Sequence, residues 1–260
     1  MGYLRLRQIC LVATGLATVE KQIADVLGLE ICFRDPGVGK YGLHNALFAA
    51  GGTFLEVVSP TKPDTAAGRY IERRKGDGGY MYIVDCDNLE TRREHFKSEG
   101  VRLVEDLKAS EWGLTGEGIH LHPRDTGGCL LSVDRHSPDG ENMMGSYKWA
   151  GPKWQEHDRS KTVAQIVGAA IQTPDPADLA AKWSHLLQRP LRKAETGGMD
   201  IHLDQGFVHI GSLRDDRGEG LRAVYLKTKD KAAILANADK AAVHRGDDYV
   251  DLVGVRFMLV

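Results

Sequence analysis

Short apolar runs typical of strands alternate along the chain with stretches whose apolar residues recur at helical spacing. In the first sixty residues, a helical stretch stops at Gly28, and two strand-like runs are joined by a glycine turn at Gly51-Gly52. The pattern predicts a β-α-β-β-β unit with a strand at 7–13, a helix at 18–27 and strands at 30–34, 43–48 and 53–60.

The same order of elements recurs in the next sixty residues, where the helical stretch ends at Gly100. The period is too long for a solenoid, so the chain contains tandem units rather than a stacked array. The second unit is predicted as a strand at 79–85, a helix at 88–98 and strands at 101–107, 118–123 and 129–134.

Residues 137–160 interrupt this pattern, because they are polar and irregular and contain Pro138 and Pro152. Trp149 and Trp154 lie in the same segment, and we expect them to pack it against a domain. We therefore predict an N-terminal domain of two units at 1–136, a linker at 137–160 and a C-terminal domain at 161–260.

The C-terminal region repeats the β-α-β-β-β order less clearly, as a third unit and a shortened fourth unit. We expect its His202 and His209 to be structural. The predicted elements are strands at 163–171, 199–203, 207–210, 221–227, 249–252 and 255–260, with helices at 175–187 and 229–241. The fold class that follows is α+β.

Composition narrows the range of functions. The 260 residues include 42% hydrophobic residues and carry a formal net charge of -2, which gives no electrostatic argument for binding nucleic acid or an anionic membrane. No apolar run is long enough to span a bilayer, and the start does not read as a signal peptide. Four widely spaced cysteines without a CxxC pair suggest a reduced, cytoplasmic protein with no disulfide framework.

Glu56 is the most informative single residue, because it is a carboxylate within an apolar strand. An unpaired buried carboxylate is costly, so such a residue usually has a metal, a basic side chain or a substrate proton as its partner. Phe54 and Val58 share its face, which favours a lined cavity over a solvent-exposed position.

The segment 61–78 is rich in lysine and arginine, and a helix that begins at Thr65 would be basic on one side. One interpretation is a solvated connector between the first two units. The other is a basic rim for an anionic substrate such as a carboxylate or a phosphate.

Paired β-α-β-β-β units resemble the vicinal oxygen chelate superfamily, which includes glyoxalase I, methylmalonyl-CoA epimerase, extradiol dioxygenases and bleomycin-resistance proteins. Residues 51–60 (GGTFLEVVSP) are similar to the superfamily's strand that carries a glutamate. Residues 122–131 (HPRDTGGCLL) are similar to the turn of the epimerases, and residues 42–47 resemble a strand of glyoxalase-like proteins. The resemblance implies two curved, cup-like mixed sheets with helices on their convex sides.

The superfamily's metal ligands come from the first and last strands of each unit, which here implies the positions of Gln8, Glu56, Tyr80 and Ser132. Only Glu56 among these is a strong ligand, so the usual divalent-metal site does not carry over intact. His120 and His122 are two apart on a predicted strand and would share one face. A divalent metal held by Gln8, Glu56, His120 and His122 is the alternative site.

The resemblance leads to an enzyme as the first hypothesis. Glu56 would be the base that moves a proton beside a carbonyl, and His120, His122 or a metal would stabilise the enolate. The substrate would be a small oxo acid, a thioester or a ring-derived metabolite, and an isomerase, epimerase or lyase is favoured over an extradiol dioxygenase.

The second hypothesis is a protein that sequesters a small molecule, as the bleomycin-resistance proteins do. Aromatic residues, Trp112 among them, would then form stacking walls. Under either hypothesis the protein binds a small molecule. The chain is expected to be either a compact monomer or a homodimer. The expected substrate-binding residues are Gln8, His44, Phe54, Tyr80, Tyr82 and Ser132.

Overall fold

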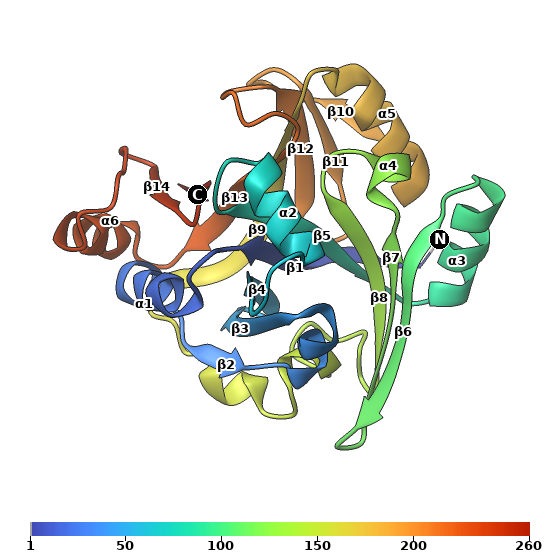
Figure 1. The fold of residues 1–260 in the computed structure, drawn as a ribbon, viewed down its shortest axis with the longest axis horizontal. Helices are drawn as coiled ribbons and strands as arrows, with labels where there is room; N and C mark the ends of the chain where they lie inside the picture. Colours follow the sequence, from blue (N-terminus) through green and yellow to red (C-terminus); the bar gives the residue numbers. More distant parts are fainter. Residues whose placement is uncertain (1) are drawn as a thin grey trace.

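The computed structural model describes residues 2–260 and contains the four expected units (Figure 1). The first comprises β1 (Leu4–Val12), α1 (Leu16–Leu27), β2 (Ile31–Phe33), β3 (Leu43–Ala50) and β4 (Thr53–Pro60). The second comprises β5 (Gly78–Cys86), α3 (Leu89–Ser98), β6 (Leu103–Glu111), β7 (Leu114–Leu121) and β8 (Leu130–Ser137).

The third unit comprises β9 (Val163–Thr173), α5 (Pro176–Leu187), β10 (Leu191–Lys193), β11 (Met199–His202) and β12 (Phe207–Ser212). The fourth is one strand shorter, with β13 (Gly220–Thr228), α6 (Lys231–Lys240), β14 (Tyr249–Leu252) and β15 (Val255–Leu259). Short helices lie in the connections: η1 (Pro36–Tyr41), α2 (Ala66–Arg73), α4 (Pro123–Thr126), η2 (Lys148–Ala150) and η3 (Trp154–His157).

Each pair of units forms one mixed sheet, which confirms the predicted α+β class. The first sheet has the order β2-β3-β4-β1-β5-β8-β7-β6, and the second has the order β10-β11-β12-β9-β13-β15-β14. In the first sheet β1 runs parallel to β4 and antiparallel to β5, and in the second β9 repeats this arrangement with β12 and β13. The first sheet curls strongly, so that β3 and β6 stand on opposite sides of a cup (Figure 1).

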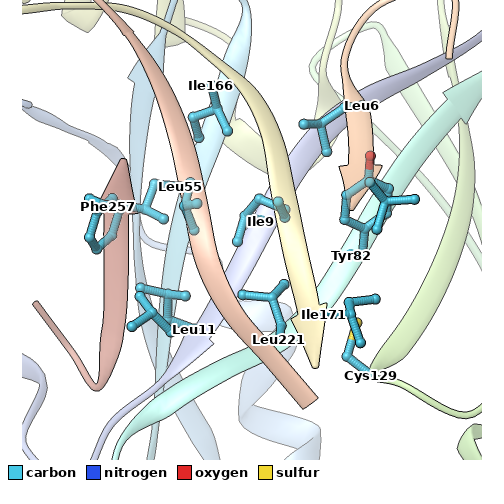
Figure 2. Packing of buried hydrophobic residues seen from close by; sticks show 14 of the residues in the cluster. Leu6, Ile9, Leu11, Leu55, Tyr82, Cys129, Ile166, Ile171, Leu221 and Phe257 are labelled. Carbon is cyan, nitrogen blue, oxygen red and sulfur yellow. The ribbon is translucent and has the colours of Figure 1, made fainter. Parts of the chain in front are cut away.

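The two sheets share one hydrophobic core. One face of β1 and β4, carrying Ile9 and Leu55, packs toward Ile166, Leu221 and Phe257 of the second sheet (Figure 2). The four long helices α1, α3, α5 and α6 contribute buried residues to the same core. This core face is the convex side of the first sheet, so its opposite, concave face, here called the cup face, remains for other contacts.

The hairpin of β3 and β4 shows how closely the two halves approach each other. Gly51 and Gly52 form its turn with φ of 59° and 75°, a left-handed conformation that glycine adopts without strain. A Cβ atom on Gly51 would lie 2.1 Å from the carbonyl oxygen of Ala164 in the second half. Glycine is therefore required there both for the turn and for the approach of the chain.

The hairpin of β6 and β7 is longer than the sequence pattern predicts. It continues to a tight turn at Trp112 and Gly113, both with positive φ, whereas the pattern predicts strands only at 101–107 and 118–123. This hairpin lies at the edge of the sheet, and β6 is largely exposed, so its polar residues hide the apolar alternation of a strand. The short strand β10 was missed for a similar reason, because its residues are at most half-buried.

Residues 138–160 fold back into the cup, which fits the expectation that the two tryptophans pack the segment down. Tyr147 stacks on Phe54 with 4.3 Å between ring centroids, and Trp154 meets the same ring edge-on at 5.0 Å. Sheet-forming residues end at Ser137 and resume at Val163. Within residues 2–260 no helix has the length and apolar character needed to cross a membrane.

Candidate active site

Alternation along the strands assigns the side chains of the cup face. On β1 the residues Cys10 and Val12 face the cup, while Ile9 and Leu11 face the core. A β-bulge after Leu6 shifts the register, so that Gln8 also faces the cup. The cup face therefore brings together polar residues from β1, β3, β4, β7 and β8.

Glu56 lies on β4 near the middle of the cup and is 7% exposed. Two amide groups hold its carboxylate: Asn45 Nδ2 donates to Oε1 at 2.6 Å, and Gln8 Nε2 donates to Oε2 at 2.8 Å. No lysine, arginine or histidine of residues 2–260 forms an ion pair with it within 4.0 Å. Burial raises the pKa of the Glu56 carboxyl above its ordinary value, and the amide donors only partly oppose this shift.

The amides that hold Glu56 are themselves fixed in place. Tyr147 Oη donates to Gln8 Oε1 at 2.8 Å, and the backbone N–H of Asp35 donates to Asn45 Oδ1 at 2.8 Å. Both acceptor oxygens are thereby occupied, so the amide N–H groups must point at the carboxylate. Glu56 is thus positioned by hydrogen bonds without being neutralised by a cation.

A second buried carboxyl lies on β8, on the far wall of the cup. Asp134 Oδ1 accepts a hydrogen bond from Ser132 Oγ at 2.6 Å, and Oδ2 accepts one from Trp149 Nε1 at 2.9 Å. Ser132, a sequence-predicted site residue, is fully buried beneath it on the same face. Sequence reasoning missed Asp134, although a residue two positions after Ser132 shares its face of a strand.

Asp134 gives the protein a testable pH dependence. Burial raises the pKa of its carboxyl from 3.8 to about 7. The folded protein holds this proton between those pH values while the unfolded chain releases it, so stability falls as the pH rises through that range. Asp134→Asn can donate to Ser132 and accept from Trp149, so we expect it to be more stable than the wild type at pH 8 by about 2 kcal/mol.

Urea unfolding of both proteins at pH 4.5 and pH 8 measures this difference. The difference in unfolding free energy between the variant and the wild type should be larger at pH 8 than at pH 4.5. An equal difference in unfolding free energy at both pH values would show that Asp134 is ionised throughout and that burial does not control its titration.

The two histidines of the predicted metal set are not arranged as the pattern suggested. His120 is on the cup face of β7, and burial lowers the pKa of its ring to about 4, so it is neutral near pH 7. His122 lies beyond the end of β7, because Pro123 begins α4 and His122 caps it, with Nδ1 accepting from Arg124 N at 3.2 Å. The structure therefore does not place His122 beside His120.

The predicted substrate-binding residues divide between two faces. Phe54 and Tyr80 are on the cup face, but Phe54 lies beneath Tyr147. Tyr82 is on the core face beside Trp183, because a bulge at Tyr80 turns the strand. His44 is exposed on the side opposite Asn45.

The donor set around Glu56 does not fit the expected divalent metal. Nowhere in residues 2–260 do three or more histidine, cysteine, aspartate or glutamate side chains gather closely enough to hold an ion. Gln8 turns its amide nitrogen to Glu56 and its oxygen to Tyr147, so its oxygen is not free as a ligand. No step of the chemistry below is therefore assigned to a metal.

A groove of about 710 Å³ lies between α2, α4 and the loop that carries residues 216–219 of the second half. Tyr70 and Tyr80 form part of its wall and meet edge-to-face at 5.0 Å. Cys10, which is the register partner of Glu56 on the neighbouring strand, lies close to Tyr80. The groove thus approaches the cup through Tyr80 without being lined by Glu56.

The sequence matches a known family over most of its length. The model of the family described as "Glyoxalase-like domain" covers residues 9–187, which include most of the first half, with Glu56, and the first part of the second half. The chain belongs to this family. This confirms the resemblance to the vicinal oxygen chelate superfamily.

Among curated proteins, the glyoxalase-like chain is similar to the mitochondrial methylmalonyl-CoA epimerases of mouse and human. It is 24% identical to the mouse protein over 132 residues, which are 50% of this chain and 72% of that one. It is 25% identical to the human protein over 128 residues, or 48% and 71% of the two chains. The chain is therefore a distant relative of epimerase enzymes.

Among solved structures, a hypothetical protein from Staphylococcus aureus aligns with 99% of this chain and 99% of its own. The TM-score is 0.68 and the sequence identity is 13%. The likeness shows that the tandem glyoxalase-like fold, with both of its halves, also occurs in that protein.

Proposed function

We propose that this glyoxalase-like protein is an enzyme that moves a proton at a carbon beside a carbonyl group, with Glu56 as the base. The observation that carries the proposal is the state of Glu56: a buried carboxyl, oriented by two amides, with a raised pKa and no cationic partner in the described chain. Such a group accepts a proton without first breaking an ion pair.

In the proposed step, the Glu56 carboxylate takes the proton from the carbon, and the C–H electron pair moves to form an enolate with its charge on the carbonyl oxygen. Delivery of a proton to the opposite face of that carbon completes an epimerisation, and delivery to a different atom of the enolate completes an isomerisation. His120, which is neutral on the same face, is the proposed donor to the enolate oxygen. The substrate class is a small oxo acid, a ring-derived metabolite or a thioester, the last being the class named for the curated relatives.

Because Glu56 is nearly buried, substrate entry requires part of the cup to move. The turn of η1 is the proposed moving part. Lys40 in this turn reaches Glu105 of β6 at 3.6 Å, and Asp35 at its start holds Asn45. An exposed ion pair of this kind contributes little stability, so the contact between Lys40 and Glu105 gives little resistance to opening of the turn.

A binding protein of the bleomycin-resistance type is the second candidate. The observation in its favour is that aromatic residues of the segment 147–154 occupy part of the cup, while the 710 Å³ groove is not lined by Glu56. In that case the protein would hold a small molecule without turning it over.

Solvent exchange distinguishes the two candidates. The protein is incubated in deuterium oxide with a panel of thioesters, oxo acids and cyclic ketones, and proton NMR follows the hydrogen beside each carbonyl. The enzyme proposal predicts catalysed loss of that signal for at least one compound. Saturable binding of a panel compound with no exchange above the rate without protein would favour the binding protein.

A further inference from the structure

The groove between α2, α4 and the 216–219 loop, here called the arginine groove, carries an excess of positive charge. Five arginines line it against only two carboxylates, those of Asp216 and Glu219. The arginines are Arg69, Arg73, Arg74, Arg124 and Arg217.

Both carboxylates of the groove are already engaged. Asp216 pairs with Lys75, with 2.7 Å between Nζ and Oδ2. Glu219 accepts hydrogen bonds from the backbone N–H of Gly128 at 2.7 Å and from Thr173 Oγ1 at 2.5 Å. Neither carboxylate forms an ion pair with an arginine of the groove within the described chain.

Two of the arginines form the framework of the groove. Arg74 is buried and donates to the carbonyl oxygens of residues 217, 218 and 219, at 2.6 to 2.8 Å. Arg217 donates in return to the carbonyl of Arg74 at 2.9 Å. These two guanidinium groups join the two halves of the chain through neutral carbonyls, so their charges are not cancelled by a carboxylate.

The other three arginines are exposed and face the groove. Arg69 and Arg73 are four apart on α2 and share one face of the helix, because Ala67 and Ile71 turn the other face to the cup. Arg73 lies 5.1 Å from the centre of the Tyr70 ring, and Arg69 donates to a backbone oxygen of Asp64 at 2.6 Å. Arg124 stands across from them on α4.

We propose that the arginine groove binds a phosphate-bearing anion, which the exposed guanidinium groups of Arg69, Arg73 and Arg124 hold from both sides. Guanidinium groups match phosphate oxygens with paired hydrogen bonds, and a site with several of them suits a ligand with at least two negative charges. The apolar floor of Tyr70, Tyr80 and Leu130 suits a planar or apolar group joined to the phosphate. The site is distinct from Glu56, and it does not depend on proton transfer there.

The two halves of the chain build this site together. α2 and α4 come from the first half, and the loop that positions Arg74 comes from the second. Gly220 ends that loop, and a Cβ there would approach the Arg74 guanidinium carbon to 2.8 Å. We infer that one role of the second half is to complete the groove.

Calorimetric titration of the full chain with inorganic pyrophosphate and with ADP, at low ionic strength, tests the proposal. We expect saturable binding that weakens as salt is added. In the double variant Arg73→Gln/Arg124→Gln, the dissociation constant should rise tenfold or more, because two charge-assisted contacts are lost. Tighter binding of ADP than of pyrophosphate would identify a nucleotide-type ligand, and equal binding would identify the phosphate group alone.

A charge-matched control is Lys97→Gln/Arg192→Gln, which removes two exposed positive charges away from the groove. This variant should bind both probes as the wild type does. The absence of saturable binding of either probe, or an equal loss in the control, would overturn the proposal. Glu56→Gln should bind both probes normally, so a failure of the proposed proton transfer would leave this result intact.

Discussion

Glu56→Gln is expected to keep the fold and to lose proton-transfer activity by roughly 10²-fold or more. The substitution keeps the size of the side chain but removes the carboxylate that would accept the proton. The amide donors from Gln8 and Asn45 orient the group but cannot replace its basicity. Deuterium exchange into a compound found by the solvent-exchange screen measures the loss.

The stability of the same variant separates a catalytic from a structural role. Because burial raises the pKa of Glu56, ionisation is unfavourable to the fold, and this cost grows as the pH rises above 4.5. Glu56→Gln removes this cost, but its amide nitrogen faces an N–H donor of Gln8 or Asn45. Because these two effects oppose each other, the variant should unfold at a temperature close to that of the wild type at pH 8. A loss of about 3–5 kcal/mol would instead indicate that Glu56 is the structural partner of a cation.

Glu94→Gln is a suitable control, because Glu94 is exposed on α3, which packs on the convex side of the first sheet, opposite the cup face. It should change neither the exchange rate nor the melting temperature. Full exchange activity in Glu56→Gln, with the control unaffected, would end the hypothesis that Glu56 is the base.

Trp154→Ala is expected to cost about 3–5 kcal/mol of unfolding free energy. Trp154 is 1% exposed and packs against Phe54 on the cup face, so its removal leaves a cavity between the segment 138–160 and the first sheet. The result would show that this segment is part of the folded cup rather than a free linker.

Trp112→Ala supplies the matched comparison, since Trp112 is 47% exposed at the tip of the hairpin of β6 and β7. We expect it to cost less than about 1 kcal/mol. Urea unfolding of the two variants and the wild type measures both values. Equal stability of Trp154→Ala and the wild type would mean that the segment does not pack as the structure describes.

The order of strands and helices was predictable because each unit repeats the same alternation of apolar periods. The position of Glu56 on the concave face followed from its neighbours, since Phe54 and Val58 share its face. Asp134 was accessible to the same reasoning from Ser132. The pattern carries this information because both strands are buried and regular.

Other parts of the site depended on features that the sequence does not display. The bulge at Tyr80 places Tyr80 and Met81 on one face of the strand and Tyr82 on the other. Simple alternation would instead place Tyr80 and Tyr82 on the same face. Pro123 ends β7 and removes His122 from the face of His120. The basic side of α2 was visible in the sequence. Arg217, however, is more than 140 residues from Arg74, and only the packing of the two halves brings it to the arginine groove.

The titration of Glu56 itself is the most direct measurement, because it needs no substrate. Carbon-13 NMR of the glutamate carboxyls follows each group with pH, and Glu56→Gln identifies the Glu56 resonance by its disappearance. We expect a pKa above the ordinary value of 4.5, because burial without a cationic partner disfavours the charged form. A pKa at or below 4.5 would contradict the picture of Glu56 as an uncompensated base inside the cup.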